Sequence, residues 1–395
     1  MKPKLFIVSF SFLAVDSRVL RQIRSLAPHF DITVAGFGGN PSPQVPGVQF
    51  RFVELKRQRG TMGKLLRVAS YPFGAIFRGA DFWPWSLTSE YRDARLALFS
   101  EQYDLVLCND LNTVFLGVEA LQEKGIPFVA DYHEYSSREA TEKLEFRLLK
   151  APHAHRCLKR LGPLAAGSIT VNQPFADAFQ NDYGFPAIVV LNAPELRPLP
   201  SRANGTAGQI HLIHHGVAGP NRNIEVMIRA MAKVREEFVL HLMLVTTPEC
   251  LAQLKEEAKL NAPGRVIFEE PVPPAEVAAR VSHFDVGLLL LENHSFNNRC
   301  ALPNKVFEYV HGGLGVCSTR SPAMETFIQS HTNGWLIDEV STNALADCLN
   351  SLTRADIEEK KAASLRARES VHAHGETAKM VKMLTEIAGR SAGQF

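Results

Sequence analysis

The chain has 395 residues, of which 46% are hydrophobic and 21% are charged. This length exceeds what one ordinary core supports, so we expect two domains, and the composition excludes extended disorder. The 43 basic and 41 acidic residues leave a net charge of +2, which does not suggest the basic stripe of a nucleic-acid-binding protein, and no nucleic-acid partner is expected.

The cysteines and the N-terminus indicate the compartment. Six cysteines are scattered along the chain without a Cys-x-x-Cys pair, which favours free thiols in the cytoplasm, where the protein could lie at the inner face of the membrane. Residues 1–10 combine lysines with an apolar run, as a signal peptide does. Asp16 and Arg18 follow at once without a small-residue cleavage site, so we favour a buried first strand. No apolar stretch reaches about 18 residues, and no membrane-spanning helix is expected.

In the first half, short apolar runs alternate with segments of helical periodicity. A strand over residues 5–10 precedes a helix that Asp16 or Ser17 can cap. Further strands are expected in six ranges, namely 31–37, 49–55, 103–108, 127–131, 167–171 and 187–191. The alternation of strand and helix indicates right-handed crossovers and a parallel sheet covered by helices on both faces.

The same rhythm restarts after a break at residues 192–208, which contain three prolines and two glycines and read as a hinge. Strands and helices then alternate, with strands expected at 210–214, 240–245, 265–269, 286–291 and 314–318, and helices at 224–234, 250–259, 274–281 and 304–310. The predicted fold class is α/β, with two doubly wound, Rossmann-like domains at 1–191 and 209–372. Their cleft would collect the carboxyl ends of both sets of strands. Residues 373–395 are expected to form a C-terminal helix that could return to the N-terminal domain.

Residues 56–85 do not fit this rhythm, because cations alternate there with aromatic and aliphatic residues. A helix pair packed on the N-terminal domain is the simpler interpretation. The alternative is an interfacial element, since cations with Trp and Phe suit the headgroup boundary of an anionic membrane. The segment is therefore a candidate for peripheral membrane contact.

The strongest binding signal is the sequence LPNKVFEYVHGG, which begins at Leu302. A helix is expected to begin near Pro303 and Asn304, because proline is tolerated in a first helical turn. The free N–H groups and positive dipole end of this helix would bind a diphosphate, and Lys305 adds a full cation. Glu308, further along the helix, can accept hydrogen bonds from vicinal ribose hydroxyls. An ordinary capped helix remains the alternative.

A second candidate loop, HGVAGPNRN, follows the strand at 210–214. Gly216 would let the backbone approach a phosphate, and Arg222 could clamp that phosphate with its planar guanidinium group. Asn221 precedes Arg222 and is a further candidate ligand of the donor. A plain strand-to-helix turn is the alternative.

The LPNKVFEY segment with its glycine turn resembles the donor-binding segment of retaining glycosyltransferases of family four, in the form found in bacterial surface-polysaccharide enzymes. The resemblance implies the GT-B fold, in which two Rossmann-like domains face each other across a cleft. It also implies a nucleoside diphosphate sugar of the UDP or GDP type as donor, and a saccharide or lipid-linked acceptor. In that family the helical glutamate binds the nucleotide ribose, a role that Glu308 would inherit, and Arg222 matches the second cation of the phosphate loop. The sequence departs from the family at Val217, where arginine is usual, and at Cys300, where the first of two glutamates is usual.

The resemblance extends into the first domain. Asp131, His133 and Glu134 match an Asp-x-His-Glu motif that lies near the acceptor side of the cleft in family members. His133 could contact the sugar or the acceptor and assist proton movement, and a buried structural histidine is the alternative.

Three further residues are acceptor-side candidates in the first domain. Asp110 ends the strand that precedes the Asp-x-His-Glu motif. Asp16 and Arg18 lie in the first loop, where Asp16 could instead serve only as the cap of the following helix.

Together these features predict a glycosyltransferase that moves a sugar to a hydroxyl acceptor with retained anomeric configuration, in polysaccharide or glycolipid synthesis. Arg222 and Lys305 would stabilise the charge that grows on the leaving diphosphate, while His133 or Asp110 positions the acceptor. No metal and no cofactor are expected, because these cations and the helix end already neutralise the phosphates.

Other enzyme and binding classes are weaker. The pairs His153/His155 and His214/His215 lack the further ligands of a zinc site, and no Gly-x-Gly-x-x-Gly follows the first strand as in a nicotinamide dehydrogenase. A UDP-sugar 2-epimerase, which shares the two-domain fold, and a catalytically weak GT-B binding subunit remain as alternatives.

Overall fold

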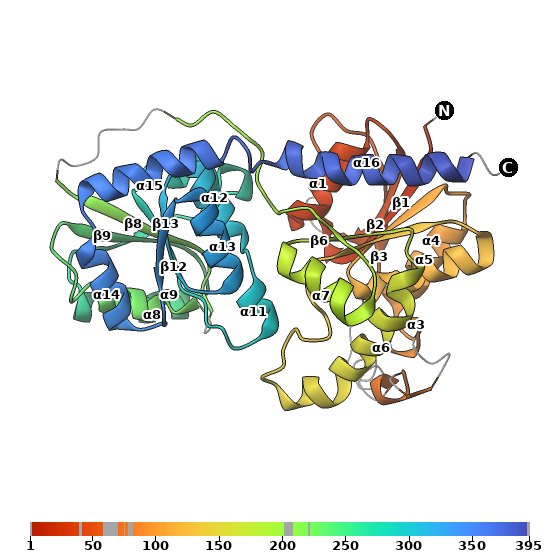
Figure 1. Ribbon diagram of the computed structural model, residues 1–395, viewed down its shortest axis with the longest axis horizontal. Helices are drawn as coiled ribbons and strands as arrows, with labels where there is room; N and C mark the ends of the chain where they lie inside the picture. Colours follow the sequence, from red (N-terminus) through yellow and green to blue (C-terminus); the bar gives the residue numbers. More distant parts are fainter. Residues whose placement is uncertain are drawn as a thin grey trace. The chain divides into compact units, whose positions relative to one another are not determined.

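The computed structural model describes residues 2–38, 42–57, 70–74, 76–77, 82–200, 208–219 and 222–392. The chain divides into two compact units (Figure 1). Unit 1 comprises residues 1–191, 295–297 and 374–395, and unit 2 comprises residues 192–294 and 298–373.

Unit 1 is built on a seven-stranded parallel sheet with the strand order β3-β2-β1-β4-β5-β6-β7. Its central strands are buried on both faces, which explains their nearly continuous apolar sequences. The strands are β1 (Lys4–Phe12), β2 (Asp31–Phe37), β3 (Arg51–Leu55), β4 (Leu105–Asn109), β5 (Phe128–Tyr132), β6 (Gly167–Thr170) and β7 (Ile188–Val189).

Helices cover this sheet, and the last helix of the chain completes the core of unit 1. Met380 and Leu384 of α16 belong to the same buried cluster as Val19 and Ile23 of α1, and α16 runs beside α1 in Figure 1. The helices are α1 (Ser17–Leu26), α3 (Trp83–Ser86), α4 (Ser89–Phe99), α5 (Leu111–Lys124), α6 (Ala151–Leu161), α7 (Gln173–Tyr183) and α16 (Ala373–Ala392). Three short turns accompany them, η1 (Leu13–Val15), η2 (Phe146–Lys150) and η3 (Gly162–Leu164), of which η2 is a π-helix.

Unit 2 repeats the plan with a six-stranded parallel sheet in the order β10-β9-β8-β11-β12-β13. Its strands are β8 (Ile210–Val217), β9 (Phe238–Val245), β10 (Val266–Glu269), β11 (Val286–Leu289), β12 (Gly315–Thr319) and β13 (Gly334–Ile337). Its helices are α8 (Ile224–Ala230), α9 (Pro248–Asn261), η5 (Pro274–Glu276), α10 (Val277–Val281), α12 (Asn304–Gly312), α13 (Pro322–His331), α14 (Thr342–Ser351) and α15 (Arg354–Ala367), while α11 (Phe296–Cys300) begins among residues of unit 1.

The predicted α/β class with two doubly wound, Rossmann-like domains is confirmed. Element ends differ by a few residues, because local periodicity does not fix where packing stops. The helix expected at 304–310 continues to Gly312, and Gly313 caps it with a φ of 73°, a conformation that glycine adopts without strain. The strand expected at 187–191 contains only Ile188 and Val189.

Two predicted segments fall largely outside the described residues. Much of the membrane-contact candidate at 56–85, including residues 58–69 and 78–81, is not described, and neither are residues 201–207 of the expected hinge. Among the helices that the structure does describe, none combines the length and apolarity needed to cross a membrane.

Candidate functional site

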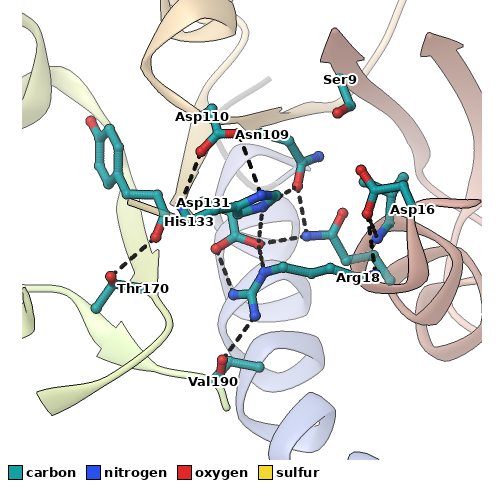
Figure 2. A network of polar contacts seen from close by, with 12 residues as sticks. Ser9, Asp16, Arg18, Asn109, Asp110, Asp131, His133, Thr170 and Val190 are labelled. Atoms are coloured by element: carbon teal, nitrogen blue, oxygen red, sulfur yellow. Dashed lines mark hydrogen bonds and ion pairs between the residues drawn. The ribbon is translucent and has the colours of Figure 1, made fainter. Parts of the chain in front are cut away.

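A buried ion pair joins α1 to β5 at the carboxyl edge of the first sheet (Figure 2). Arg18 donates from Nε and Nη2 to the two carboxylate oxygens of Asp131, at 2.7 and 2.6 Å, and from Nη1 to the carbonyl of Val190 at 2.9 Å. Both side chains are buried. A bidentate guanidinium–carboxylate pair is among the strongest polar contacts in proteins, so Arg18 is held inside unit 1 by Asp131.

Two amide side chains extend this pair into a network. Gln22 lies four residues after Arg18, on the same face of α1, and donates to Asp131 at 2.6 Å and to Asn109 at 2.9 Å. Asn109 is the register neighbour of Asp131 in the parallel pair β4–β5. Burial acts to raise the pKa of Asp131, but the charges of Arg18 and His133 and their hydrogen bonds hold it well below its usual range.

His133 lies between two carboxylates. Its Nδ1 is 3.4 Å from Asp110, and its Nε2 is 3.5 Å from Asp131 and 3.2 Å from the side-chain oxygen of Asn109. Burial alone would lower the pKa of His133, yet the two carboxylates raise it above its ordinary value. The imidazolium form is therefore favoured, so His133 is suited to donate hydrogen bonds rather than to act as a general base.

In this network, the carboxylate of Asp110 reaches solvent and that of Asp131 does not. Its side chain is 40% exposed, against 0% for Asp131. Its backbone has a φ of 66°, which non-glycine residues rarely adopt, and its N–H donates to the carbonyl of Asp131 at 2.8 Å. Strained backbone concentrates at functional sites, and here it aims an accessible carboxylate from the end of β4.

Asp16 and Glu134 have different surroundings from the other acceptor-side candidates. The carboxylate of Asp16 accepts from the N–H groups of Arg18 and Val19 at 3.2 and 3.1 Å, which makes it the N-cap of α1. Glu134 is exposed and lies beside Glu139. The structure thus brings Arg18, Asp131, His133 and Asp110 together. Asp16 caps the helix that carries Arg18, and Glu134 lies close enough to Asp110 and His133 for their charges to interact.

In unit 2, Lys305 lies against the end of β8. It belongs to the first turn of α12, which begins after Pro303. Gly216 has a φ of 108°, and a Cβ added there would come within 2.9 Å of Cε and 3.0 Å of Nζ of Lys305. Only glycine fits this approach, so the strand end and the helix start expected from the sequence are neighbours. Leu302 is half-buried beside them, whereas Asn304 is exposed.

Lys305 and Arg222 form a pair of like charges. Burial and the neighbouring charge of Arg222 lower the pKa of Lys305 to about 8, while Glu308 acts in the opposite direction. In the part of the chain that the structure describes, neither cationic side chain has a hydrogen bond or ion pair. Two half-buried like charges that lie this close together are suited to bind an anion.

Glu308 lies one turn after Lys305 and faces His215, whose Nε2 is 3.3 Å from Oε2 of the glutamate. His215 packs edge-on against Tyr309 with ring centroids 5.3 Å apart. Burial and the nearby Lys305 lower the pKa of His215 to about 3, so the ring is neutral. Sequence reasoning did not place His215 in the site. Its position before Gly216 at a strand's carboxyl end was the available signal.

The two departures from the family pattern carry no charge into this cluster. Val217 is 62% exposed at the end of β8, and Cys300 is buried. The described cations near Gly216 are Lys305 and Arg222, and Asn221 lies outside the described residues. No group of three or more metal-ligating side chains occurs among the residues with described positions.

Comparisons with known proteins show the family of both halves of the chain. A family model described as Glycosyltransferase Family 4 matches residues 16–193, and one described as Glycosyl transferases group 1 matches residues 209–355. No curated protein sequence matches the chain.

Solved structures share the fold at low identity. HepE of Anabaena in complex with UDP is 15% identical, with a TM-score of 0.72 over 97% of this chain and 100% of that one. Sucrose-phosphate synthase of Thermosynechococcus elongatus is 14% identical, with a TM-score of 0.71 over 98% and 100%. WaaG, a glycosyltransferase involved in lipopolysaccharide biosynthesis, is 14% identical, with a TM-score of 0.66 over 96% and 98%. Because glycosyltransferase family models match both halves of the chain and these structures share its fold, the chain is a glycosyltransferase of the GT-B fold.

Proposed function

We propose that the protein transfers a sugar from a nucleoside diphosphate sugar to a hydroxyl group of a saccharide or lipid-linked acceptor, with retention of anomeric configuration. The observation that carries the donor assignment is the pair of cations, Lys305 and Arg222, at the start of α12. A diphosphate between them would relieve their repulsion and meet the free N–H groups of the helix. The UDP and UDP-glucose complexes of HepE support a donor of this class.

The leaving group accounts for the placement of these charges. As the bond between the anomeric carbon and the diphosphate oxygen breaks, negative charge grows on that oxygen. Lys305, Arg222 and the start of α12 would stabilise it without moving, because Lys305 is already held against Gly216. Glu308 would accept the ribose hydroxyls, and the neutral ring of His215 would keep the carboxylate in place.

Unit 1 would supply the acceptor side. The new bond forms between the acceptor oxygen and the anomeric carbon, on the face that the diphosphate leaves, and the acceptor proton passes to a departing phosphate oxygen. Asp110, exposed at the end of β4, would orient the acceptor hydroxyl, and His133 would donate a hydrogen bond to the sugar. Arg18 and Asp131 would hold these two groups and have no contact with substrate.

Three further assignments belong to the same proposal. Catalysis needs no metal ion, since the cations already balance the diphosphate, and activity would persist in the presence of EDTA. Bacterial polysaccharide or glycolipid synthesis is the process that the WaaG likeness favours. All six cysteines are free thiols, which suits a cytoplasmic enzyme.

A donor panel tests the proposal. The purified protein is incubated with UDP-, GDP- and TDP-sugars, with and without EDTA, and the products are separated by chromatography. Slow donor hydrolysis, or transfer to an added saccharide with a retained anomeric signal in NMR spectra, would support it. Epimerised donor would identify a 2-epimerase, and binding without turnover would identify a binding subunit. Either outcome would reject the transferase.

A further inference from the structure

A second basic site lies in unit 1, outside the network of Figure 2. An open pocket of about 590 Å³ is formed by α6, by η2 and by the chain that follows β5. None of its nine lining residues is acidic. Six of them are basic or imidazole side chains, namely Arg138, Arg147, His155, Arg156, Lys159 and Arg160.

The local sequence explains this concentration of charge. Arg156, Lys159 and Arg160 recur at helical spacing and present their cations on one face of α6, a helix that contains no carboxylate. Arg147 comes from η2, a π-helical turn of the kind often found at functional sites. The three glutamates of the same stretch, Glu139, Glu142 and Glu145, are absent from the lining.

One wall of the pocket is fixed by hydrogen bonds. The hydroxyl of Tyr183 is 2.7 Å from Oγ of the buried Ser137 and 3.2 Å from Nδ1 of His155. Arg138 donates to Asp182 at 2.8 Å, and its guanidinium carbon is 5.6 Å from the ring centre of Tyr135. Because these hydrogen bonds already hold the side chains of this wall in place, little conformational entropy would be lost when an anion binds.

The pocket is also tied to the acceptor-side network by a short stretch of chain. Arg138 follows His133 by five residues, which limits their Cα separation to about 18 Å. A short saccharide that carries a phosphate can span a separation of this order. The cavity volume is within the usual range for small-molecule sites and exceeds the space that a bare anion needs.

We propose that this pocket binds the phosphate or diphosphate group of a phosphorylated saccharide acceptor and so directs the reacting hydroxyl toward His133 and Asp110. The acceptor part rests on the proposed transferase function, whereas binding of the anion does not. A soluble sugar phosphate and an anionic phospholipid headgroup both carry a phosphate ester, so either could supply the group that the pocket binds.

Calorimetric titration of inorganic pyrophosphate into the full chain tests the proposal. The pocket variant is Arg147→Ala/Lys159→Ala, in which both residues are exposed and removable without loss of packing. The matched control is Lys143→Ala/Lys150→Ala, which removes the same charge from exposed positions of the same stretch outside the lining. All proteins also carry Arg222→Ala/Lys305→Ala, so that the proposed donor site of unit 2 does not add a second binding event.

We expect pyrophosphate affinity to fall at least about tenfold in the pocket variant, as for the loss of a charge-assisted contact, and less than about twofold in the control. Glucose 1-phosphate should compete with pyrophosphate, and vesicles of phosphatidylglycerol should not. Equal losses in both variants, or competition only by the vesicles, would show a diffuse basic surface and overturn the proposal. Pyrophosphate binding without competition by glucose 1-phosphate would mean an adventitious ion only, and would also overturn it.

The donor proposal can fail separately. If Lys305→Ala alone left UDP binding unchanged, the donor assignment would be wrong while the pocket result stood. A loss of UDP binding in Lys305→Ala, together with unchanged pyrophosphate binding in the pocket variant, would support the donor assignment and overturn the pocket.

Discussion

The two polar clusters at the strand ends of units 1 and 2 use their charges in opposite ways. In unit 1 the carboxylate of Asp131 is enclosed, and Arg18, Gln22 and the ring of His133 surround it. In unit 2 the cations of Lys305 and Arg222 lie close enough to repel, and neither has a hydrogen-bond or ion-pair partner among the described residues. A closed network stabilises its own geometry, whereas an open pair of like charges is stabilised only when an anion arrives.

Under the proposed function, Arg18 and Asp131 are a scaffold, whereas Lys305 and Arg222 bind the ligand. Removing a charge from a closed, buried network leaves its partner without compensation and destabilises the fold. Removing a charge from an open pair relieves repulsion, so the fold is unaffected and the cost falls on function. Variants of the two clusters should therefore show opposite patterns in unfolding and kinetic measurements.

The largest expected effect is that of Asp131→Ala on stability. The substitution leaves the guanidinium of Arg18 buried without its carboxylate, and we expect the free energy of unfolding to fall by about 3–5 kcal/mol. Urea denaturation followed by circular dichroism measures this. Because the pKa of Asp131 is held low, its contribution is present above about pH 4 and is lost as the pH falls.

Asp16→Ala provides the comparison for Asp131. It removes only the cap of α1 and should cost about 1 kcal/mol. A loss below about 1 kcal/mol for Asp131→Ala would mean that the network does not hold Arg18.

The second effect is that of Lys305→Ala on catalysis. We expect kcat/KM to fall by the equivalent of about 2–4 kcal/mol in activation free energy, because one cation at the leaving diphosphate is lost. The free energy of unfolding should change by less than about 0.5 kcal/mol. Lys259→Ala, at an exposed position of α9, is the matched control and should leave both quantities unchanged. If Lys305→Ala lowered the free energy of unfolding and left kcat/KM unaltered, Lys305 would be a structural residue and the contrast between the two clusters would be wrong.

A third variant tests the contact between β8 and α12. Gly216→Ala places a Cβ against Lys305 at a position with positive φ. We expect the local strain to cost about 1–3 kcal/mol of conformational free energy and to displace Lys305, so that the KM for the donor rises. Gly219→Ala, in the same loop, meets no atom within 4 Å and serves as the control. Equal donor KM values for the two variants would show that donor binding does not depend on the close packing of Lys305 against Gly216.

The smallest effect is a pH dependence of donor binding. With a pKa of about 8, Lys305 is charged below pH 8 and loses its proton above it. Since only the charged form attracts a diphosphate, donor KM should rise by about fourfold near pH 8.5 relative to its plateau below pH 7. Lys305→Arg stays charged and should flatten this profile. A profile that rises equally in both proteins would assign the titration to another group.

Local patterns allowed the helix that carries Lys305 and Glu308 to be predicted from the sequence. Lys305 and Glu308 lie within one helix that begins directly after Pro303, and spacing alone sets which side chains of a helix share a face. The fold class was likewise accessible, because alternating apolar runs and helical periods are local.

Contacts between distant residues were not accessible from the sequence. Arg18 and Asp131 are 113 residues apart, and their pairing depends on the parallel order β1-β4-β5, which brings the start of α1 and the end of β5 to the same edge of the sheet. For the same reason Gln22 and His215 were missed, although each stands near a predicted site residue. The strain at Asp110 also has no sequence signal, since aspartate is common at the start of helices with ordinary φ values.

The most direct test of the central claim, that Lys305 and Arg222 hold the diphosphate of the donor, is calorimetric binding of UDP and GDP to the wild type and to Arg222→Ala/Lys305→Ala. The exposed pair Lys255→Ala/Lys259→Ala is the control of equal charge. We predict that the nucleotide that binds the wild type binds the site variant at least about 100-fold more weakly, as expected for two charge-assisted contacts. The control variant should retain full affinity. Equal affinity of the wild type and the Arg222→Ala/Lys305→Ala protein would contradict the account.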